Sequence, residues 1–285
     1  MIKIFNYFFQ ALFIYFFFII GKIIGLNLSR KLFSFIFLKF APFFKSRKVL
    51  EFNLKNLNKD ISLELKTKII NSMWKNYGMT FIEYIYLDYF KKNNSHTIIE
   101  GEKNLNDVLL NEKPVIFVSG HFANFELMSM EITKKEIKLA TIYRPLNNIF
   151  LNPFMEYLRK KYICKNQIKK GIKGVKNSIE YIKKGYSIAL MIDQRVSEGE
   201  KVNFFDKPAL TTTLPAQLAI KFNLPIVPVS IKRSEDNKFI IKFHDKINSS
   251  EFKDKLQITN RLNHILENMI IDNPYQWIWT HDRWK

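Results

Sequence analysis

The spacing of apolar residues changes twice along the chain. An uncharged apolar run covers residues 4–21, and residues 50–95 then carry apolar side chains at helical spacing. After His96, short runs rich in β-branched residues alternate with amphipathic helical stretches. This alternation predicts an α/β fold, with a mostly parallel central sheet flanked by helices and a helical segment before it.

The same pattern places the individual elements. Residues 63–77 and 80–90 are predicted to form helices, with Gly78 between them. The predicted strands are short apolar runs, at residues 115–119, 139–143, 186–192, 226–231, 239–243 and 277–280. No internal repeat or low-complexity linker interrupts the sequence, which favours one domain after the N-terminal segment.

The apolar run at residues 4–21 is predicted to be a membrane anchor. As a helix it would be roughly 27 Å long, which is marginal for crossing a bilayer. Its many aromatic side chains suit interfacial or tilted insertion, and the sequence allows either spanning or lying on the membrane. A signal peptide is the rival interpretation, but no small-x-small cleavage site follows the run.

Residues 30–48 mix aromatic and basic side chains, as a helix lying on an anionic membrane surface does. An ordinary buried amphipathic helix is the alternative. Cations are denser after the apolar run than before it, so the positive-inside bias places the main domain in the cytoplasm. We therefore predict a membrane anchor over residues 1–48 and a catalytic domain over residues 49–285.

The charge balance implies an anionic partner. Lys and Arg number 45 against 26 Asp and Glu, which gives a net charge of +19. Nucleic acid, anionic lipid headgroups and an acidic carrier protein all fit this charge, although a Lys- and Asn-rich composition also arises from an AT-rich genome. The single cysteine, Cys164, excludes an intramolecular disulfide and any multi-cysteine metal site.

Three predicted strands end at residues capable of chemistry. One strand runs into Gly120 and His121, a second into Arg144, and a third into Asp193 and Gln194. Ligands of open α/β sheets bind beyond the carboxyl ends of the strands, so these residues are expected to converge there. For Asp193 and Gln194, capping of the next turn is the alternative.

His121 and Glu126 are the candidate pair for catalysis, although the spacing alone favours a structural histidine. Gly120 permits a tight turn out of the strand, after which a helix is expected to begin. A separation of five positions rotates two helical side chains apart by about 140°, so the pair meets only if His121 lies at or before the first turn. Glu126 would then accept a hydrogen bond from one imidazole nitrogen, leaving the other to deprotonate a hydroxyl that attacks an acyl thioester. Arg144 would stabilise the oxyanion or bind a phosphate.

Several segments together resemble one known family. In chain order they are residues 53–54, 74–78 with Glu83, 119–126, 143–148, 193–194, 204–209, 211–216 and 274–284. They are similar to the bacterial lipid A biosynthesis acyltransferases, the lauroyl and myristoyl transferases that acylate Kdo2-lipid IVA, within the lysophospholipid acyltransferase superfamily. The resemblance runs through nearly the whole chain in order and implies a glycerolipid acyltransferase-like fold.

This resemblance implies a set of partners and a location. The donor would be an acyl carrier protein thioester, and the acceptor a hydroxyl of a lipid A precursor. The catalytic domain would lie on the cytoplasmic face of the bacterial inner membrane, against its anionic surface. Neither a cofactor nor a metal would be needed, and nucleic acid would not be a partner.

The resemblance also implies roles for residues in the candidate site. In the segment at 119–126, His121 would be the general base and Glu126 its partner. The substrate-binding residues would be Gly120, Asn124, Arg144, Asp193 and Gln194.

Two positions depart from the family pattern. Tyr275 stands where the family usually has glutamate, and Asp206 where it usually has glycine. Neither touches the His121 motif, so these departures concern substrate details and a turn.

Three alternatives remain. A lysophosphatidic acid acyltransferase belongs to the same superfamily, but such enzymes usually carry His-x4-Asp and a later Glu-Gly-Thr-Arg segment, which this chain lacks. A related enzyme that acylates another lipid, such as an ornithine lipid, would share the motif, because acceptor choice and acyl length depend on pocket shape. A non-catalytic basic protein bound to the membrane would bind anions in a salt-dependent way, independently of His121.

Overall fold

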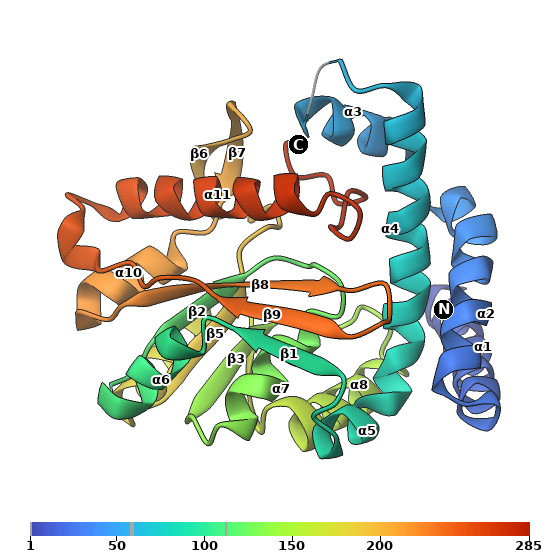
Figure 1. Cartoon of the computed structure of the whole chain (residues 1–285), viewed down its shortest axis with the longest axis horizontal. Coiled ribbons are helices and arrows are strands. Elements are labelled where there is room, and N and C mark those ends of the chain that lie inside the picture. The colour runs from blue at the N-terminus through green and yellow to red at the C-terminus, as the bar shows by residue number, and fades with distance from the viewer. Residues whose placement is uncertain (1, 58–59, 112) are drawn as a thin grey trace.

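The computed structural model describes residues 2–57, 60–111 and 113–285. The strands are β1 (Thr97–Glu100), β2 (Ile116–Ser119), β3 (Leu139–Tyr143), β4 (Asn166–Lys169), β5 (Ser187–Met191), β6 (Glu200–Phe204), β7 (Lys207–Thr211), β8 (Ile226–Arg233) and β9 (Phe239–Phe243). Seven of them form one sheet in the order β1-β9-β8-β2-β5-β3-β4 (Figure 1). Among the described strands of this sheet only the β8–β9 pair is antiparallel, which confirms a mostly parallel sheet, while β6 and β7 pair antiparallel in a separate hairpin.

The helices flank this sheet. They are α1 (Ile2–Ile24), α2 (Leu26–Phe40), α3 (Arg47–Leu57), α4 (Leu63–Glu83), α5 (Leu87–Lys92), α6 (Glu102–Asn111), α7 (Glu126–Lys134), α8 (Asn152–Leu158), α9 (Ile172–Lys183), α10 (Leu214–Phe222) and α11 (Lys255–Asp272), with the short turns η1 (Ala41–Phe44), η2 (Tyr84–Tyr86), η3 (Arg159–Ile163) and η4 (Ser249–Glu251). Figure 1 shows α11 over one face of the sheet and α7 on the other. Helix α4 stands at one end, with α1 and α2 beyond it.

The central strands are buried because their side chains face helices on both sides. Every residue of β2 is buried, and so are most residues of β5 and β8. Strands that are buried on both faces consist of continuous apolar runs, so they can be located from the sequence. The predicted strand at 277–280 is wrong: this segment forms turns, in which Trp277 and Trp279 are buried while their indole N–H groups donate to Asp193 and to the Pro274 carbonyl.

Helix α4 continues through Gly78, so the predicted break at this residue is wrong. A Cβ atom there would collide with the backbone carbonyl of Phe33 in α2. Gly78 therefore allows α2 and α4 to approach closely, rather than ending a helix.

The N-terminal helices pack along α4. Helix α1 is apolar and long enough to cross a membrane, and 17% of its most apolar window is buried inside the protein. In α2 the buried residues Ser29, Arg30 and Phe33 face the protein, while Phe35 and Phe40 are exposed. The division into an anchor over residues 1–48 and a catalytic domain over 49–285 stays a prediction. The contacts of α2 show that part of this segment is integrated into the fold.

Candidate active site

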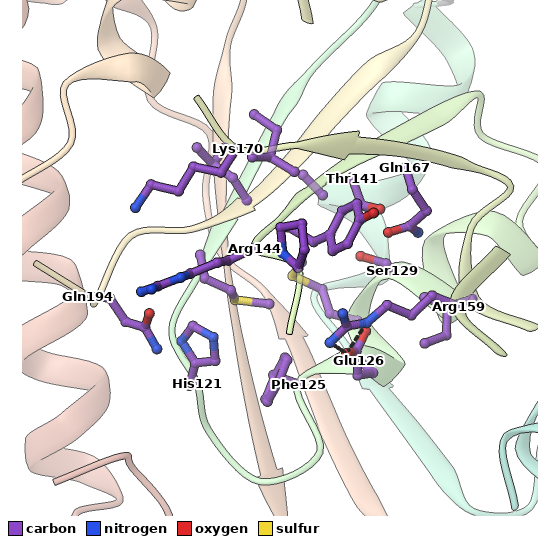
Figure 2. A pocket seen from close by; sticks show the side chains of 18 of the residues that line it. His121, Phe125, Glu126, Ser129, Thr141, Arg144, Arg159, Gln167, Lys170 and Gln194 are labelled. Carbon is purple, nitrogen blue, oxygen red and sulfur yellow. Dashed lines mark hydrogen bonds and ion pairs between the residues drawn. The ribbon is translucent and has the colours of Figure 1, made fainter. Parts of the chain in front are cut away.

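A cavity of about 450 Å³ opens at the carboxyl ends of the parallel strands. His121 follows β2, Arg144 follows β3 and Gln194 lies just after β5, and all three side chains line this cavity (Figure 2). Strands β2, β5 and β3 are neighbours in the sheet. The structure therefore brings together the residues that the three strand ends were expected to supply.

Asp193 holds the imidazole of His121 in place. Its Oδ1 lies 2.7 Å from His121 Nδ1, and its Oδ2 accepts a hydrogen bond of 2.7 Å from the His121 backbone N–H. Trp277 Nε1 donates to the same Oδ2 at 2.9 Å. An ionised carboxylate only accepts hydrogen bonds, so Nδ1 carries a proton, and in the neutral imidazole the lone pair is then on Nε2.

The ionised state of Asp193 follows from its surroundings. The carboxylate is buried, and burial by itself raises its pKa. The neighbouring His121, the hydrogen bonds from it and the one from Trp277 outweigh burial and hold the pKa of Asp193 below its usual value. A buried, charged acceptor beside an imidazole is the arrangement that makes a histidine an oriented base.

The prediction that Glu126 accepts a hydrogen bond from His121 is wrong. Residues 120–125 do not form a helix, and Ala123 in this segment has a left-handed backbone with φ of 43°. His121 therefore does lie before the first turn of α7, as the pairing required. The ring nitrogen nevertheless reaches Asp193, and Glu126 lies further along the same cavity, on the other side of Phe125 (Figure 2).

Glu126 instead binds Arg159 and Tyr84. Its Oε1 accepts hydrogen bonds of 2.7 Å from both Arg159 Nε and the Tyr84 hydroxyl. All three side chains line the cavity. Burial acts to lower the pKa of Arg159, but the charge of Glu126 outweighs it and raises that pKa, so the guanidinium stays charged.

Sequence reasoning missed Arg159 and Tyr84. Arg159 begins the π-helix η3, and π-helical turns are often found at functional sites, but the sequence gives no sign of the π turn. The signal that was available is Glu126 itself, since a carboxylate at the start of a buried helix needs a cationic partner.

Gly120 and Asn124 were expected to bind substrate, and the structure gives them other contacts. The Asn124 side chain is buried and donates to Glu83 Oε2 at 2.9 Å, which ties the motif to α4. A Cβ atom on Gly120 would lie 2.9 Å from Leu266 Cδ1 and 3.3 Å from Asp193 Oδ2. Among the described residues that line the cavity, neither of the two occurs.

Arg144 is an exposed cation that lines the cavity. Lys170 lines the same cavity, and Figure 2 shows its side chain on the same side as Arg144, His121 and Gln194. Two cations at one cavity attract an anionic group. No group of His, Cys, Asp and Glu suited to a metal ion occurs among the described residues.

An oriented histidine beside a partly apolar cavity is the kind of site that transfer enzymes use to activate a hydroxyl. The comparisons agree with this class. The chain belongs to the bacterial lipid A biosynthesis acyltransferase family, whose model matches residues 2–285. The expected family is thus confirmed, and the protein is an acyltransferase that acts on a lipid.

Solved structures that are similar to this chain include one that matches over most of its length. It is the crystal structure of the 1-acyl-sn-glycerophosphate (LPA) acyltransferase PlsC from Thermotoga maritima. The two chains are 16% identical, and the match covers 89% of this chain and 96% of PlsC with a TM-score of 0.42. No match was found among curated protein sequences.

Proposed function

We propose that this protein transfers a fatty acyl chain from an acyl carrier protein thioester to a hydroxyl of a lipid A precursor of the Kdo2-lipid IVA type. Membership of the lipid A family supports a lipid A precursor as acceptor. The net charge of +19 suits both an acidic carrier protein and a phosphorylated lipid. The apolar helix α1 supports a place at the inner membrane, with the catalytic domain on the cytoplasmic face.

The proposed reaction uses His121 as general base. Nε2 removes the proton of the acceptor hydroxyl while its oxygen attacks the thioester carbonyl carbon. The new C–O bond forms, the C–S bond breaks, and the imidazolium returns the proton to the departing thiolate. Because the acceptor hydroxyl takes the place of a catalytic serine, no acyl-enzyme intermediate is required. Asp193 fixes the tautomer and stabilises the imidazolium in this scheme.

Glu126 acts in this proposal through Arg159. It holds the guanidinium at the cavity wall by a hydrogen bond and an ion pair in which Arg159 Nη2 lies 2.5 Å from Oε1. A fixed, partly desolvated guanidinium offers N–H donors and positive charge to a thioester oxygen that becomes negative. We therefore assign Glu126 as a positioning residue rather than as the partner of the base.

Arg144 is proposed to bind a phosphate at the cavity. Its exposed position suits a ligand group that remains partly in water, such as a lipid phosphate or the phosphate of the carrier's prosthetic arm. Gln194 lies beside it and supplies neutral donor and acceptor atoms.

The observation that carries the proposal is the buried Asp193 carboxylate bound to His121 at the cavity. The test incubates purified protein with acyl carrier protein thioester and Kdo2-lipid IVA, and follows the acylated lipid by mass spectrometry. His121→Ala should lower the rate by roughly 10²–10⁴-fold, the usual contribution of a general base. His264→Ala serves as the control, since His264 is exposed and pairs only with Glu267 among the described residues. Transfer only to lysophosphatidic acid, or equal rates for wild type and His121→Ala, would contradict the proposal.

A further inference from the structure

From Ala11 onward, helix α1 has a buried face and an exposed face. The inner face carries Ala11, Phe18 and Gly21, which are buried in the protein. Most of the exposed side chains of α1 are apolar, and the large ones are Ile2, Ile4, Phe5, Phe8, Phe9, Leu12, Phe13, Phe16, Ile19 and Ile23. The inner face is covered by the protein itself, so the exposed face is the part of α1 that lacks an apolar partner.

The contacts of the inner face run from one end of α1 to the other. Near the start, the Tyr7 carbonyl accepts a hydrogen bond of 2.8 Å from Asn148 Nδ2. Near the end, the Gly21 carbonyl accepts one of 2.5 Å from the Tyr86 hydroxyl, and Lys22 Nζ lies 3.4 Å from Asp88 Oδ1. Fifteen residues separate Tyr7 from Lys22, which corresponds to roughly 22 Å along a helix. The catalytic body is therefore attached to α1 over most of a bilayer's hydrocarbon thickness, which is about 30 Å.

This attachment conflicts with α1 crossing a bilayer upright. An upright helix would carry the irregular loop at residues 144–151 and the carboxylate of Asp88 into the hydrocarbon region. Irregular backbone exposed to lipid does not occur there, because its N–H and C=O groups would lack hydrogen-bond partners. A charged carboxylate in that region is also costly. A helix lying in the plane of the membrane leaves both groups at the water interface.

The polar residues on α1 agree with this orientation. Lys3, Asn6 and Gln10 are exposed and follow one another at spacings of three and four positions, so they form one strip along the helix. A helix in the membrane plane presents such a strip to the headgroups and water, and its apolar face to the acyl chains.

The loop at residues 146–150 extends the apolar surface to the active site. Phe150 packs against Phe8 with ring centroids 5.6 Å apart, and its carbonyl accepts a hydrogen bond of 2.9 Å from the Tyr15 hydroxyl. Ile149 beside it is 55% exposed. At the start of the same loop, Leu146 lines the cavity that contains His121.

We propose that α1 lies in the plane of one leaflet of an anionic phospholipid bilayer, with the loop at 146–150 beside it at the membrane interface, so that the cavity opens toward that leaflet. The partner is thus the membrane itself, and α1 does not span it. The inference deepens the proposed function, on which its functional meaning rests, because a lipid acceptor would reach His121 along the leaflet without leaving it.

The topology is tested with single surface cysteines on the full chain. Cys164 is buried, so the unmodified chain gives the background for a membrane-impermeant maleimide. Lys3→Cys reports the start of α1, and Lys238→Cys reports the catalytic body, where Lys238 is exposed next to Asp236. Both should react in inverted inner-membrane vesicles and neither in intact spheroplasts. Reaction of Lys3→Cys from the side opposite to Lys238→Cys would show a spanning helix and overturn the proposal.

The loop is tested by a matched pair of isoleucines. Ile149→Cys and Ile172→Cys, at 55% and 83% exposure, are labelled with a polarity-sensitive fluorophore and placed in vesicles of phosphatidylethanolamine with a minority of phosphatidylglycerol. Brominated lipid should quench the label at position 149 several-fold more strongly than the label at position 172. Equal quenching at the two positions would show that the loop does not lie at the membrane surface.

Neither experiment measures acyl transfer. A chain that failed to acylate Kdo2-lipid IVA but labelled on one side would refute the proposed function and retain this inference. If the protein acylated the lipid but Lys3→Cys reacted from the side opposite to Lys238→Cys, the proposed function would stand and this inference would be refuted.

Discussion

Asp193 and Glu126 are carboxylates that each hold a different basic side chain lining the same cavity. Asp193 is buried and binds the imidazole of His121, whereas Glu126 binds the guanidinium of Arg159. In the proposed mechanism the first contact sets the protonation of the base and the second sets the position of a cation. Loss of the two charges should therefore have distinguishable consequences.

Asp193→Asn and Glu126→Gln form a matched pair that tests these roles. Asp193→Asn should lower kcat by roughly 10²–10⁴-fold, because an amide no longer fixes the reactive tautomer. The acidic limb of its pH–rate profile should move to lower pH, because the imidazolium loses the negative charge that stabilises it.

Glu126→Gln should reduce kcat without moving that limb. Its effect passes through Arg159, which stays protonated throughout the working pH range. Steady-state rates measured from pH 5 to pH 9 with purified variants compare the two. If the acidic limb of the pH–rate profile shifted in Glu126→Gln and not in Asp193→Asn, Glu126 rather than Asp193 would be the partner of the catalytic base.

The sequence predicted which residues gather at the site better than which of them touch. Each strand end carries its own signal in the alternation of apolar runs and polar residues, so the convergence of His121, Arg144 and Gln194 was predictable. The partner of His121 is 72 residues away in the sequence and lies just after β5. Its identity depends on the register of β2 against β5, which one sequence does not reveal.

At the scale of elements, burial decides which predictions succeed. The predicted bounds of β3 and β9 agree with the structure. The missed strands β1 and β4 form the two edges of the sheet, where only part of each strand is buried and the apolar run is short.

The hairpin β6–β7 was missed for a different reason. Its turn residues Phe205 and Asp206 have φ of 51° and 56°, a conformation usually supplied by Asn-Gly or Asp-Gly. The absence of glycine at position 206, noted as a departure from the family, removed the turn signal. The turn itself is retained, with Asp206 adopting the left-handed conformation that Asp tolerates better than most residues.

The packing of α2 on α4 yields a prediction about Gly78. In an isolated helix, Gly78→Ala would stabilise by about 1 kcal/mol. Here the added methyl group meets the Phe33 carbonyl, so the substitution should instead destabilise the protein by about 1–3 kcal/mol. Unfolding in detergent, followed by circular dichroism, measures the change. Asn71→Ala, at an exposed position of the same helix, should be neutral or slightly stabilising. A Gly78→Ala protein as stable as Asn71→Ala would show that α2 does not pack at this distance.

At the scale of the whole molecule, one buried ion cluster joins the N-terminal helices to the catalytic motif. Glu83 in α4 accepts from Arg30 Nε of α2 at 2.7 Å and from Arg233 Nη2 of β8 at 2.9 Å. Its Oε2 also accepts from Asn124, which lies between His121 and Glu126. Burial raises the pKa of Glu83, but the charges and hydrogen bonds of the two arginines outweigh it and keep that pKa low. The segment predicted as anchor is thereby fixed to the residues that shape the active site.

The same packing buries His96 between α5 and the edge of the sheet, and this sets the acid sensitivity of the fold. Its ring lies 4.7 Å from that of Phe90, and within the described residues its ring nitrogens have no hydrogen-bond partner. Burial, followed by the charges of Lys134 and Arg30, lowers the pKa of His96 from 6.5 to about 4. In the unfolded chain the imidazole regains its ordinary pKa, so the unfolded state binds the extra proton between these two values.

Stability should therefore fall as the pH decreases from about 6.5 to about 4, with His96 contributing roughly 2–3 kcal/mol of that loss. His96→Leu removes the titrating group, so its free energy of unfolding should depend less steeply on pH over this interval, even if its stability at neutral pH is lower. His264→Gln, which replaces an exposed histidine, should keep the wild-type slope. Urea unfolding in detergent at a series of pH values gives the three slopes. An unchanged slope in His96→Leu would mean that the imidazole finds a partner for its charge in the folded protein, and that acid sensitivity arises from the carboxylates alone.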